Sequence, residues 1–147
     1  MKIYQITNKK EYLSLLLLAD EQESMIDKYI DNSTMYVLED SGIKGEIVVC
    51  ELQEKVLEIK NLAVLPTHHK QGYGRTLINF ICNKYKNQFT KVIVGTGDSD
   101  YTIPFYEKCG FSKCFPIKNF FKDNYDHTII ENRKQLIDMI YLEKTLN

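Results

Sequence analysis

A glycine-rich, basic turn with the sequence His-Lys-Gln-Gly-Tyr-Gly-Arg occupies residues 69–75, between an apolar run and a helical pattern. The apolar run covers residues 57–65 and is ended by Pro66. Backbone N–H groups at the start of a helix lack partners within it, and with the helix dipole they direct positive charge at one point. Gly72 and Gly74 would let the backbone approach a ligand without an intervening Cβ. The segment therefore predicts an anion site, most naturally for a phosphate.

Two common phosphate loops do not fit this turn. A dinucleotide-binding fingerprint needs a third glycine where Leu77 stands, and a P-loop needs Gly-Lys-Ser/Thr after a four-residue gap. The turn instead resembles the pyrophosphate loop of the GNAT superfamily of N-acetyltransferases, Arg/Gln-x-x-Gly-x-Gly/Ala, with His69, Gly72 and Gly74 at the three defined places. Residues 105–111, Phe-Tyr-Glu-Lys-Cys-Gly-Phe, resemble the family's second block, Phe-Tyr-x-Lys-x-Gly-Phe, one helix and one strand further on. Together the two blocks identify the chain as a member of this family.

The resemblance implies a site for acetyl-CoA as co-substrate. The amides of residues 71–76 would hold the pyrophosphate, and Lys70 and Arg75 would add charge-assisted contacts. The backbone at the end of the preceding strand would pair with the pantetheine arm like an added strand. The expected acetyl-CoA-binding residues are Leu62, Ala63, Val64, His69, Lys70, Gln71, Gly72, Tyr73, Gly74, Arg75, Thr76 and Ser99. The alternative is that Gly72 and Gly74 only make a tight strand-to-helix turn.

Tyr106 is the candidate general acid, by its place in the second block. A phenol near the thioester can protonate the departing thiolate, because its pKa of about 10 lies above that of the thiol. The alternative is that Tyr106 packs between helix and sheet with its hydroxyl bonded to backbone.

Glu58 is the candidate general base, since histone-type members of the family place a glutamate five residues before the position of Ala63. A carboxylate near a hydrophobic cleft can take a proton from an ammonium, directly or through water. Against this, Glu58 and Lys60 alternate with apolar residues, which is typical of a solvated strand face. A covalent route through Cys109 is disfavoured because a buried thiol has a raised pKa, although His127 can approach in space.

No metal site is expected. The Asp-Ser-Asp at residues 98–100 has a spacing seen in metal loops, but the glycine and distal glutamate of a calcium loop are missing. Asp98 or Ser99 more naturally caps the following helix. Ser99 also stands where many family members have an asparagine near the CoA arm, and this departure leaves its role open.

Composition narrows the class of protein. The chain has 147 residues, 44% of them hydrophobic, and a net charge of −1, which predicts one domain, residues 1–147, with no affinity for nucleic acid or an anionic membrane. The longest apolar run, Leu13 to Ala19, is too short to span a bilayer. Without a signal peptide or paired cysteines, we expect reduced thiols and a cytoplasmic location.

Element order predicts the fold. Strands are expected at residues 2–6, 35–39, 44–52, 57–65, 91–96 and about 137–143, with a hairpin turn at 40–42. Helical spacing covers residues 12–19 and 25–30, the segment after Gly74 and residues 103–109. This order predicts an α/β (α+β) domain with a mixed, mostly antiparallel sheet of about 6–7 strands flanked by helices, which is also the architecture of the family.

The resulting functional hypothesis is an N-acetyltransferase that moves the acetyl group of acetyl-CoA to a primary amine by direct attack in a ternary complex. A small-molecule acceptor is favoured because no charged stripe marks a peptide groove. Acetylation of a protein N-terminus or lysine, and a CoA-binding module without catalysis, are the alternatives. A homodimer is compatible with the sequence. Five aromatic residues are either an acceptor pocket or part of the core: Tyr29, Tyr36, Phe120, Phe121 and Tyr125.

Overall fold

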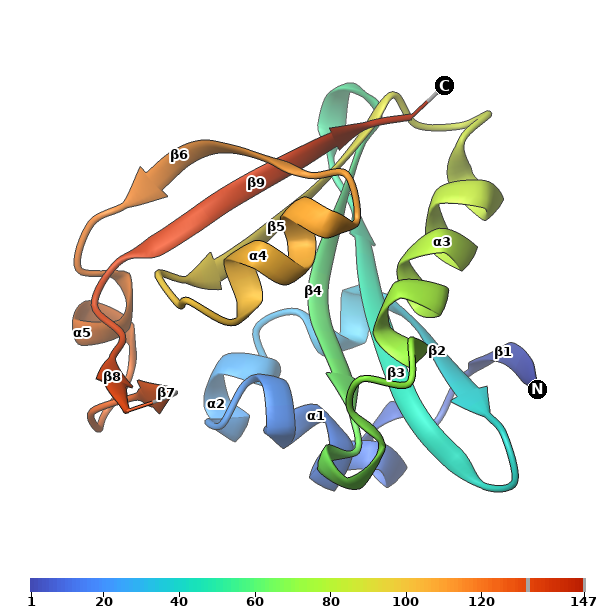
Figure 1. The fold of residues 1–147 in the computed structure, drawn as a ribbon, viewed down its shortest axis with the longest axis horizontal. Coiled ribbons are helices and arrows are strands. Elements are labelled where there is room, and N and C mark those ends of the chain that lie inside the picture. Colours follow the sequence, from blue (N-terminus) through green and yellow to red (C-terminus); the bar gives the residue numbers. More distant parts are fainter. Residues whose placement is uncertain (132, 147) are drawn as a thin grey trace.

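Seven strands form one central sheet in the order β1-β2-β3-β4-β5-β9-β6 (Figure 1). A computed structural model describes residues 1–131 and 133–146 of the chain. All neighbouring strands run antiparallel except β4 and β5, which are parallel. The predicted mixed, mostly antiparallel sheet of 6–7 strands is confirmed. The strands are β1 (Lys2–Ile6), β2 (Thr34–Glu39), β3 (Ile43–Glu51), β4 (Val56–Val64), β5 (Lys91–Gly97), β6 (Ser112–Ile117) and β9 (Met139–Thr145).

Helices cover both faces of this sheet (Figure 1). α1 (Leu13–Ala19) and α2 (Glu23–Ile26) lie on one face, and α3 (Tyr73–Tyr85) and α4 (Thr102–Lys108) lie on the other. Alternation along the strands divides the core accordingly: Leu57 and Ile59 face the α3 side, and Val37 and Val48 face the α1 side. No helix in the described ranges is long and apolar enough to cross a membrane.

The C-terminal third has elements beyond those predicted. Strand β6 and the short helix α5 (Phe120–Asn124) follow α4, and then β7 (Ile130–Glu131) and β8 (Lys134–Gln135) form a small antiparallel hairpin. In Figure 1, α5 and this hairpin lie beside the start of β9, on the side of α2.

β4 and β5 separate along their length, and this separation creates the site. Their parallel pairing runs from Val56 and Lys91 to Ile59 and Val94. At Lys60 the register between β3 and β4 shifts by one residue, a β-bulge that bends β4. Beyond the bulge, the described pairing of residues 61–64 is with β3 and that of residues 95–97 is with β9. The edges of β4 and β5 that face each other are therefore open for hydrogen bonding.

One acidic residue in the core has no ion-pair partner. Glu46 lies on β3 opposite Val37 and Ala63, and its side chain is 0% exposed. Neither carboxylate oxygen has a hydrogen-bond partner among residues 1–131 and 133–146. Burial raises the pKa of Glu46 well above its ordinary value, so folding favours the protonated acid.

We therefore expect Glu46→Gln to stabilise the protein increasingly as the pH rises. The pKa of Glu46 is higher in the folded protein than in the unfolded chain. The free energy of unfolding of the wild type therefore falls as the pH rises from the unfolded pKa to the folded pKa. The free energy of unfolding of the variant should gain on that of the wild type by at most about 1.4 kcal/mol per pH unit in this window. Urea denaturation between pH 5 and 8 measures it. Glu51→Gln, an exposed change on the same strand, is the control, and a constant difference across the range would contradict the assignment.

Candidate functional site

A cleft of about 1080 Å³ opens between the separated ends of β4 and β5. Its walls come from β4, the loop before α3, the β5–α4 connection, the α1–α2 connection and the C-terminal elements α5 and β7. Both predicted sequence blocks contribute to it. The wall residues among the predicted cofactor-binding positions are Leu62, Ala63, Val64, His69, Lys70, Gly72, Tyr73, Gly74 and Arg75.

The loop before α3 has the geometry of an anion site. Gly72 has φ of +84°, a left-handed conformation that favours glycine, and a Cβ built there would meet no described atom within 4 Å. The first described helical bond runs from the N–H of Thr76 to the carbonyl of Gly72, at 2.9 Å. The amides of residues 73–75 precede this bond, at the positive end of a 13-residue helix.

The two sequence blocks meet in the structure at Gly74. A Cβ at this position would lie 3.0 Å from Cζ of Phe105, the first residue of the second block. That separation is tighter than side chains normally tolerate, so a glycine here lets α3 and α4 pack closely at the cleft. Because Tyr106 is the next residue after Phe105, the contact between Gly74 and Phe105 positions the loop before α3 relative to Tyr106.

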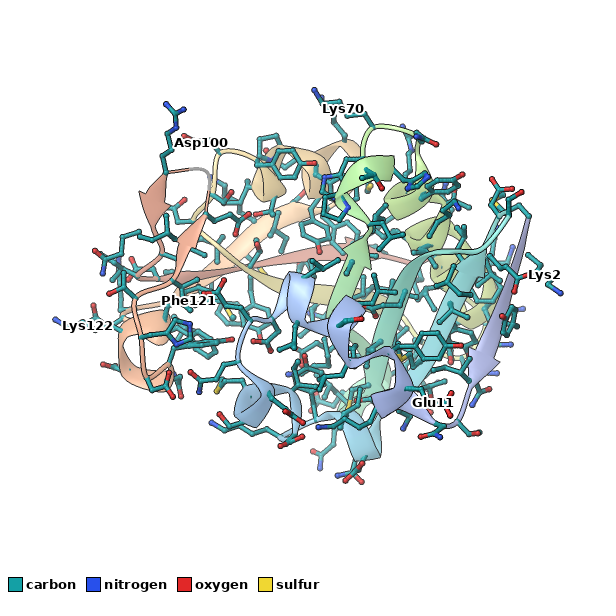
Figure 2. All side chains as sticks on the ribbon, turned by 90° about the horizontal axis from the view of Figure 1, so that it is seen from below. Lys2, Glu11, Lys70, Asp100, Phe121 and Lys122 are labelled. Carbon is teal, nitrogen blue, oxygen red and sulfur yellow. The ribbon has the colours of Figure 1, made fainter. Side chains whose placement is uncertain are left out.

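His69 is hydrogen-bonded to the strand that precedes the loop. Its Nε2 donates a hydrogen bond to the carbonyl of Val64, at 2.9 Å, and its ring stacks near that of Tyr101 with centroids 6.5 Å apart. The bond ties the loop to the end of β4. Lys70, by contrast, projects from the loop into solvent, as Figure 2 shows.

Tyr106 lies in α4 with its ring buried and in contact with the cleft. The ring packs edge-on against Phe105 and Phe111, with centroids 5.1 Å and 5.7 Å away. Its hydroxyl has no hydrogen-bond partner in the described part of the chain. The alternative, in which the hydroxyl is bonded to backbone, therefore does not describe this structure. Burial raises the pKa of Tyr106 well above the ordinary value, with smaller contributions from Cys109 and Glu46, so the phenol keeps its proton.

Glu58 is buried, at 7% exposed, and so does not belong to a solvated strand face. Its Oε2 accepts a hydrogen bond from the hydroxyl of Tyr141, at 2.7 Å, and its Oε1 lies 3.5 Å from Nζ of Lys60. Lys60 is part of the cleft wall, whereas Glu58 is not. The structure therefore places the candidate base behind the wall, two residues before the bulge at Lys60.

Ser99, Gln71 and Thr76 lie outside the described wall. The Oγ of Ser99 accepts hydrogen bonds from the N–H groups of Tyr101 (3.1 Å) and Thr102 (3.3 Å). These bonds satisfy two N–H groups at the start of α4, which is the capping role that the sequence suggested for Ser99. Thr76 donates its hydroxyl to the carbonyl of Gly72 at 2.8 Å. No group of three or more His, Cys, Asp or Glu in residues 1–131 and 133–146 is placed to hold a metal ion.

The thiol considered for a covalent route is not arranged as a nucleophile. Cys109 is buried, and burial raises its pKa although Arg75 and Lys144 act in the opposite direction. The ring nitrogens of His127 lie 2.6 Å from Asp126 and 3.1 Å from Glu21. These contacts hold the imidazole at the α1–α2 connection.

The five aromatic candidates are divided between cleft and core. Phe121 and Tyr125 form part of the cleft wall, whereas the Tyr36 hydroxyl is hydrogen-bonded to that of Tyr85 in the core, at 2.8 Å. In Figure 2, Phe121 points inward and its neighbour Lys122 points out. Tyr29, which follows α2, is hydrogen-bonded to Asp20 and Asn61 at the wall.

Sequence reasoning missed several polar residues of the wall, among them Asp20, Asn61 and Glu131. Asp20 accepts hydrogen bonds from the hydroxyls of Tyr125, at 2.6 Å, and Tyr29, at 3.1 Å. Nδ2 of Asn61 donates to the hydroxyl of Tyr29, at 3.0 Å. A lone asparagine in the apolar run 57–65 was the available signal, but the partners of Asp20 lie up to 105 residues away.

Comparisons with known proteins agree with this geometry. Residues 31–113 match the family model described as an acetyltransferase (GNAT) domain. The uncharacterized N-acetyltransferase YvbK of Bacillus subtilis (strain 168) is 33% identical over 92% of this chain and 89% of its own length. An IAA acetyltransferase from Bacillus cereus ATCC 14579 superposes with a TM-score of 0.93 at 34% identity, covering 99% of both chains. A GNAT family acetyltransferase from Elizabethkingia anophelis, solved with acetyl-CoA bound, gives 0.92 at 36% identity, covering 99% of this chain and 97% of that one.

Proposed function

Because this chain belongs to the GNAT family of acetyl-CoA-dependent acetyltransferases, we propose that it acetylates the primary amine of a small molecule by direct attack. One observation carries the proposal: the free amides at the start of α3, the open edge of β4 and Tyr106, whose hydroxyl has no partner among the described residues, all border one cleft. Each is a requirement of the reaction, and they come from different elements.

Acetyl-CoA fits the basic half of the cleft. The amides of residues 73–75 would receive the pyrophosphate, with Lys70 and Arg75 adding charge. The backbone of residues 62–64, open toward β5, would pair with the amides of the pantetheine arm. When bound, acetyl-CoA supplies an acetyl group activated as a thioester.

In the proposed reaction, the amine nitrogen forms a bond to the acetyl carbon and the carbon–sulfur bond breaks. Glu58 would take the amine proton through water, since its carboxylate lies behind the wall beside Lys60. Tyr106 would give its phenolic proton to the departing thiolate. Holding both reactants in one cleft contributes much of the acceleration, because it converts a bimolecular step into one within a complex.

A small acceptor is favoured over a polypeptide by the contacts that close one end of the cleft. Tyr125 bonds to Asp20 at 2.6 Å, the N–H of Asp126 bonds to Gln22 at 3.0 Å, and His127 lies 3.1 Å from Glu21. These contacts join the segment after α5 to the α1–α2 connection and limit the entrance. The Tyr106 hydroxyl, in turn, favours an enzyme over a CoA-binding module, which has no use for a free phenol.

We expect purified protein to release CoA thiol from acetyl-CoA in the presence of a suitable amine, with initial-rate lines that intersect when both substrates are varied. Direct attack requires both substrates to be bound together, whereas a covalent acetyl-cysteine would give parallel lines. Cys109→Ser should retain activity. A screen of small amines and short peptides, read as thiol release, measures this.

Three outcomes would count against the proposal. Acetyl label retained on Cys109 without an acceptor would contradict direct attack. Peptides that outperform every small amine would favour the protein-acetylating alternative, and CoA binding without turnover on either class would favour the non-catalytic one.

A further inference from the structure

Carboxylates gather at one end of the cleft. Three of them, from two separate segments, line the end near the α1–α2 connection: Asp20, Glu21 and Glu131. The end near α3 has Lys70 and Arg75 beside two histidines, His68 and His69. The other charged side chains of the described wall are Lys60, Asp100 and Lys108. The basic end suits the phosphates of CoA, so the acidic end is left for the acceptor.

Hydrogen bonds at the acidic end leave mainly acceptor atoms for a ligand. The hydroxyls of Tyr125 and Tyr29 both direct their protons to Asp20. The amide nitrogen of Asn61 donates to the carbonyl of Leu16, at 3.1 Å, and to Tyr29. The remaining groups are therefore phenolic lone pairs, carboxylate oxygens and Oδ1 of Asn61.

Asn61 makes the same point independently of the carboxylates. The residue is 3% exposed on the cleft wall, and its Oδ1 has no donor among the described residues. A buried carbonyl oxygen without a donor is costly, so a ligand or water N–H or O–H in this region is expected to compensate it.

Lys60 is a positively charged side chain at this end of the described wall, and it already has partners. Its Nζ lies 3.5 Å from Oε1 of Glu58 and 5.4 Å from the ring centroid of Tyr29. These contacts hold it against β4. Its positive charge lowers the pKa of Asp20, an effect smaller than that of burial, and one ammonium does not neutralise Glu58, Asp20 and Glu131 together.

The two carboxylates are also partly removed from water. Burial raises the pKa of Asp20, against the hydrogen bonds from Tyr125 and Tyr29, and burial likewise raises the pKa of Glu131. A carboxylate that has lost solvation gains most from a cation placed beside it.

We propose that the acceptor carries a second ammonium group, remote from the amine that is acetylated, and that this group binds between Asp20 and Glu131. The substrate class is then aliphatic diamines and polyamines. The reacting amine should not bind beside these carboxylates. Attack needs a neutral nitrogen, whereas a neighbouring carboxylate stabilises the protonated ammonium. This inference rests on the proposed acetyltransferase function.

Three acceptors of equal chain length test the proposal, since they differ in the charge at the far end: 1,4-diaminobutane, butylamine and 4-aminobutanoate. We expect kcat/KM to fall in that order, with the diamine preferred over butylamine by about 10- to 100-fold, the range of one charge-assisted hydrogen bond. Equal values for diamine and butylamine would overturn the inference while leaving the acetyltransferase function intact. Absence of turnover with every amine, including those of the wider screen, would instead count against the function.

Variants locate the recognition. Asp20→Asn and Glu131→Gln should each reduce the diamine-to-butylamine ratio to within a few-fold of one, whereas damage to packing would lower both rates and leave the ratio unchanged. Asp123→Asn, which removes a carboxylate from an exposed position in α5, is the matched control and should keep the ratio. Calorimetric titration of the diamine into the protein–CoA complex gives a readout without turnover: binding should weaken in the Asp20 and Glu131 variants. Unchanged binding in both would place the second ammonium elsewhere and overturn the proposal.

Discussion

Tyr106→Phe should lower kcat by roughly 10- to 1000-fold, the effect of removing one general acid. The substitution deletes only the hydroxyl, and the ring can keep its edge-on contacts with Phe105 and Phe111. Affinity for acetyl-CoA, measured by calorimetry, should therefore stay within a few-fold of the wild-type value. Steady-state kinetics with the best acceptor from the amine screen gives kcat.

Tyr4→Phe serves as the control for this prediction. Tyr4 is exposed on the edge strand β1, where its hydroxyl donates to Glu39 at 2.8 Å, far along the sheet from the cleft. Its loss should leave kcat unchanged. If Tyr106→Phe turns over at the wild-type rate, the tyrosine is a packing residue and the leaving thiolate obtains its proton from solvent.

Gly72→Asp should weaken acetyl-CoA binding by roughly 100-fold or more, because a carboxylate beside the pyrophosphate places like charges together. The open space around the built Cβ means that the side chain itself meets no described atom. The comparison is Gly72→Asn, which has the same size and tolerates the left-handed φ of +84° equally well. Titration calorimetry with acetyl-CoA measures both.

Comparing the two variants of Gly72 separates the effect of charge from that of backbone strain. Gly72→Asn should keep the affinity for acetyl-CoA to within about tenfold, since it adds a Cβ but no charge. Equal losses in Asp and Asn would show that the loop needs glycine for shape alone, and equal retention would remove the pyrophosphate from this turn. Thermal unfolding of both variants checks that the loop change leaves the fold intact.

Strong local patterns made much of the fold predictable. β1 was predicted with its observed bounds and β4 to within one residue, and the helical spacing predicted after Gly74 falls within α3, because each element shows the period of a buried face. β6 gave no such signal: every one of its side chains is exposed, so its apolar residues do not alternate with a buried face. It forms a strand through pairing with β9, which lies more than twenty residues later.

The donor half of the site was predictable and the acceptor half was not. A phosphate loop is a local structure, so Gly72 and Gly74 indicate it directly in the sequence. The acceptor end is assembled from Asp20, Asn61 and Glu131, which lie on three separate segments. Asp20 follows an apolar helix and reads as an ordinary surface residue until Tyr125 is placed against it.

The contact between Gly74 and Phe105 has a consequence for how such sequences change over descent. The two blocks that identify the family are separated by some thirty residues, yet they share one van der Waals surface, with a built Cβ only 3.0 Å from Cζ. A Cβ at position 74 can be accommodated if the ring of Phe105 moves by a few tenths of an ångström, and this ring packs against that of Tyr106. A substitution in one block is therefore transmitted to the other, and we expect the residue types at positions 74 and 105 to vary together over descent.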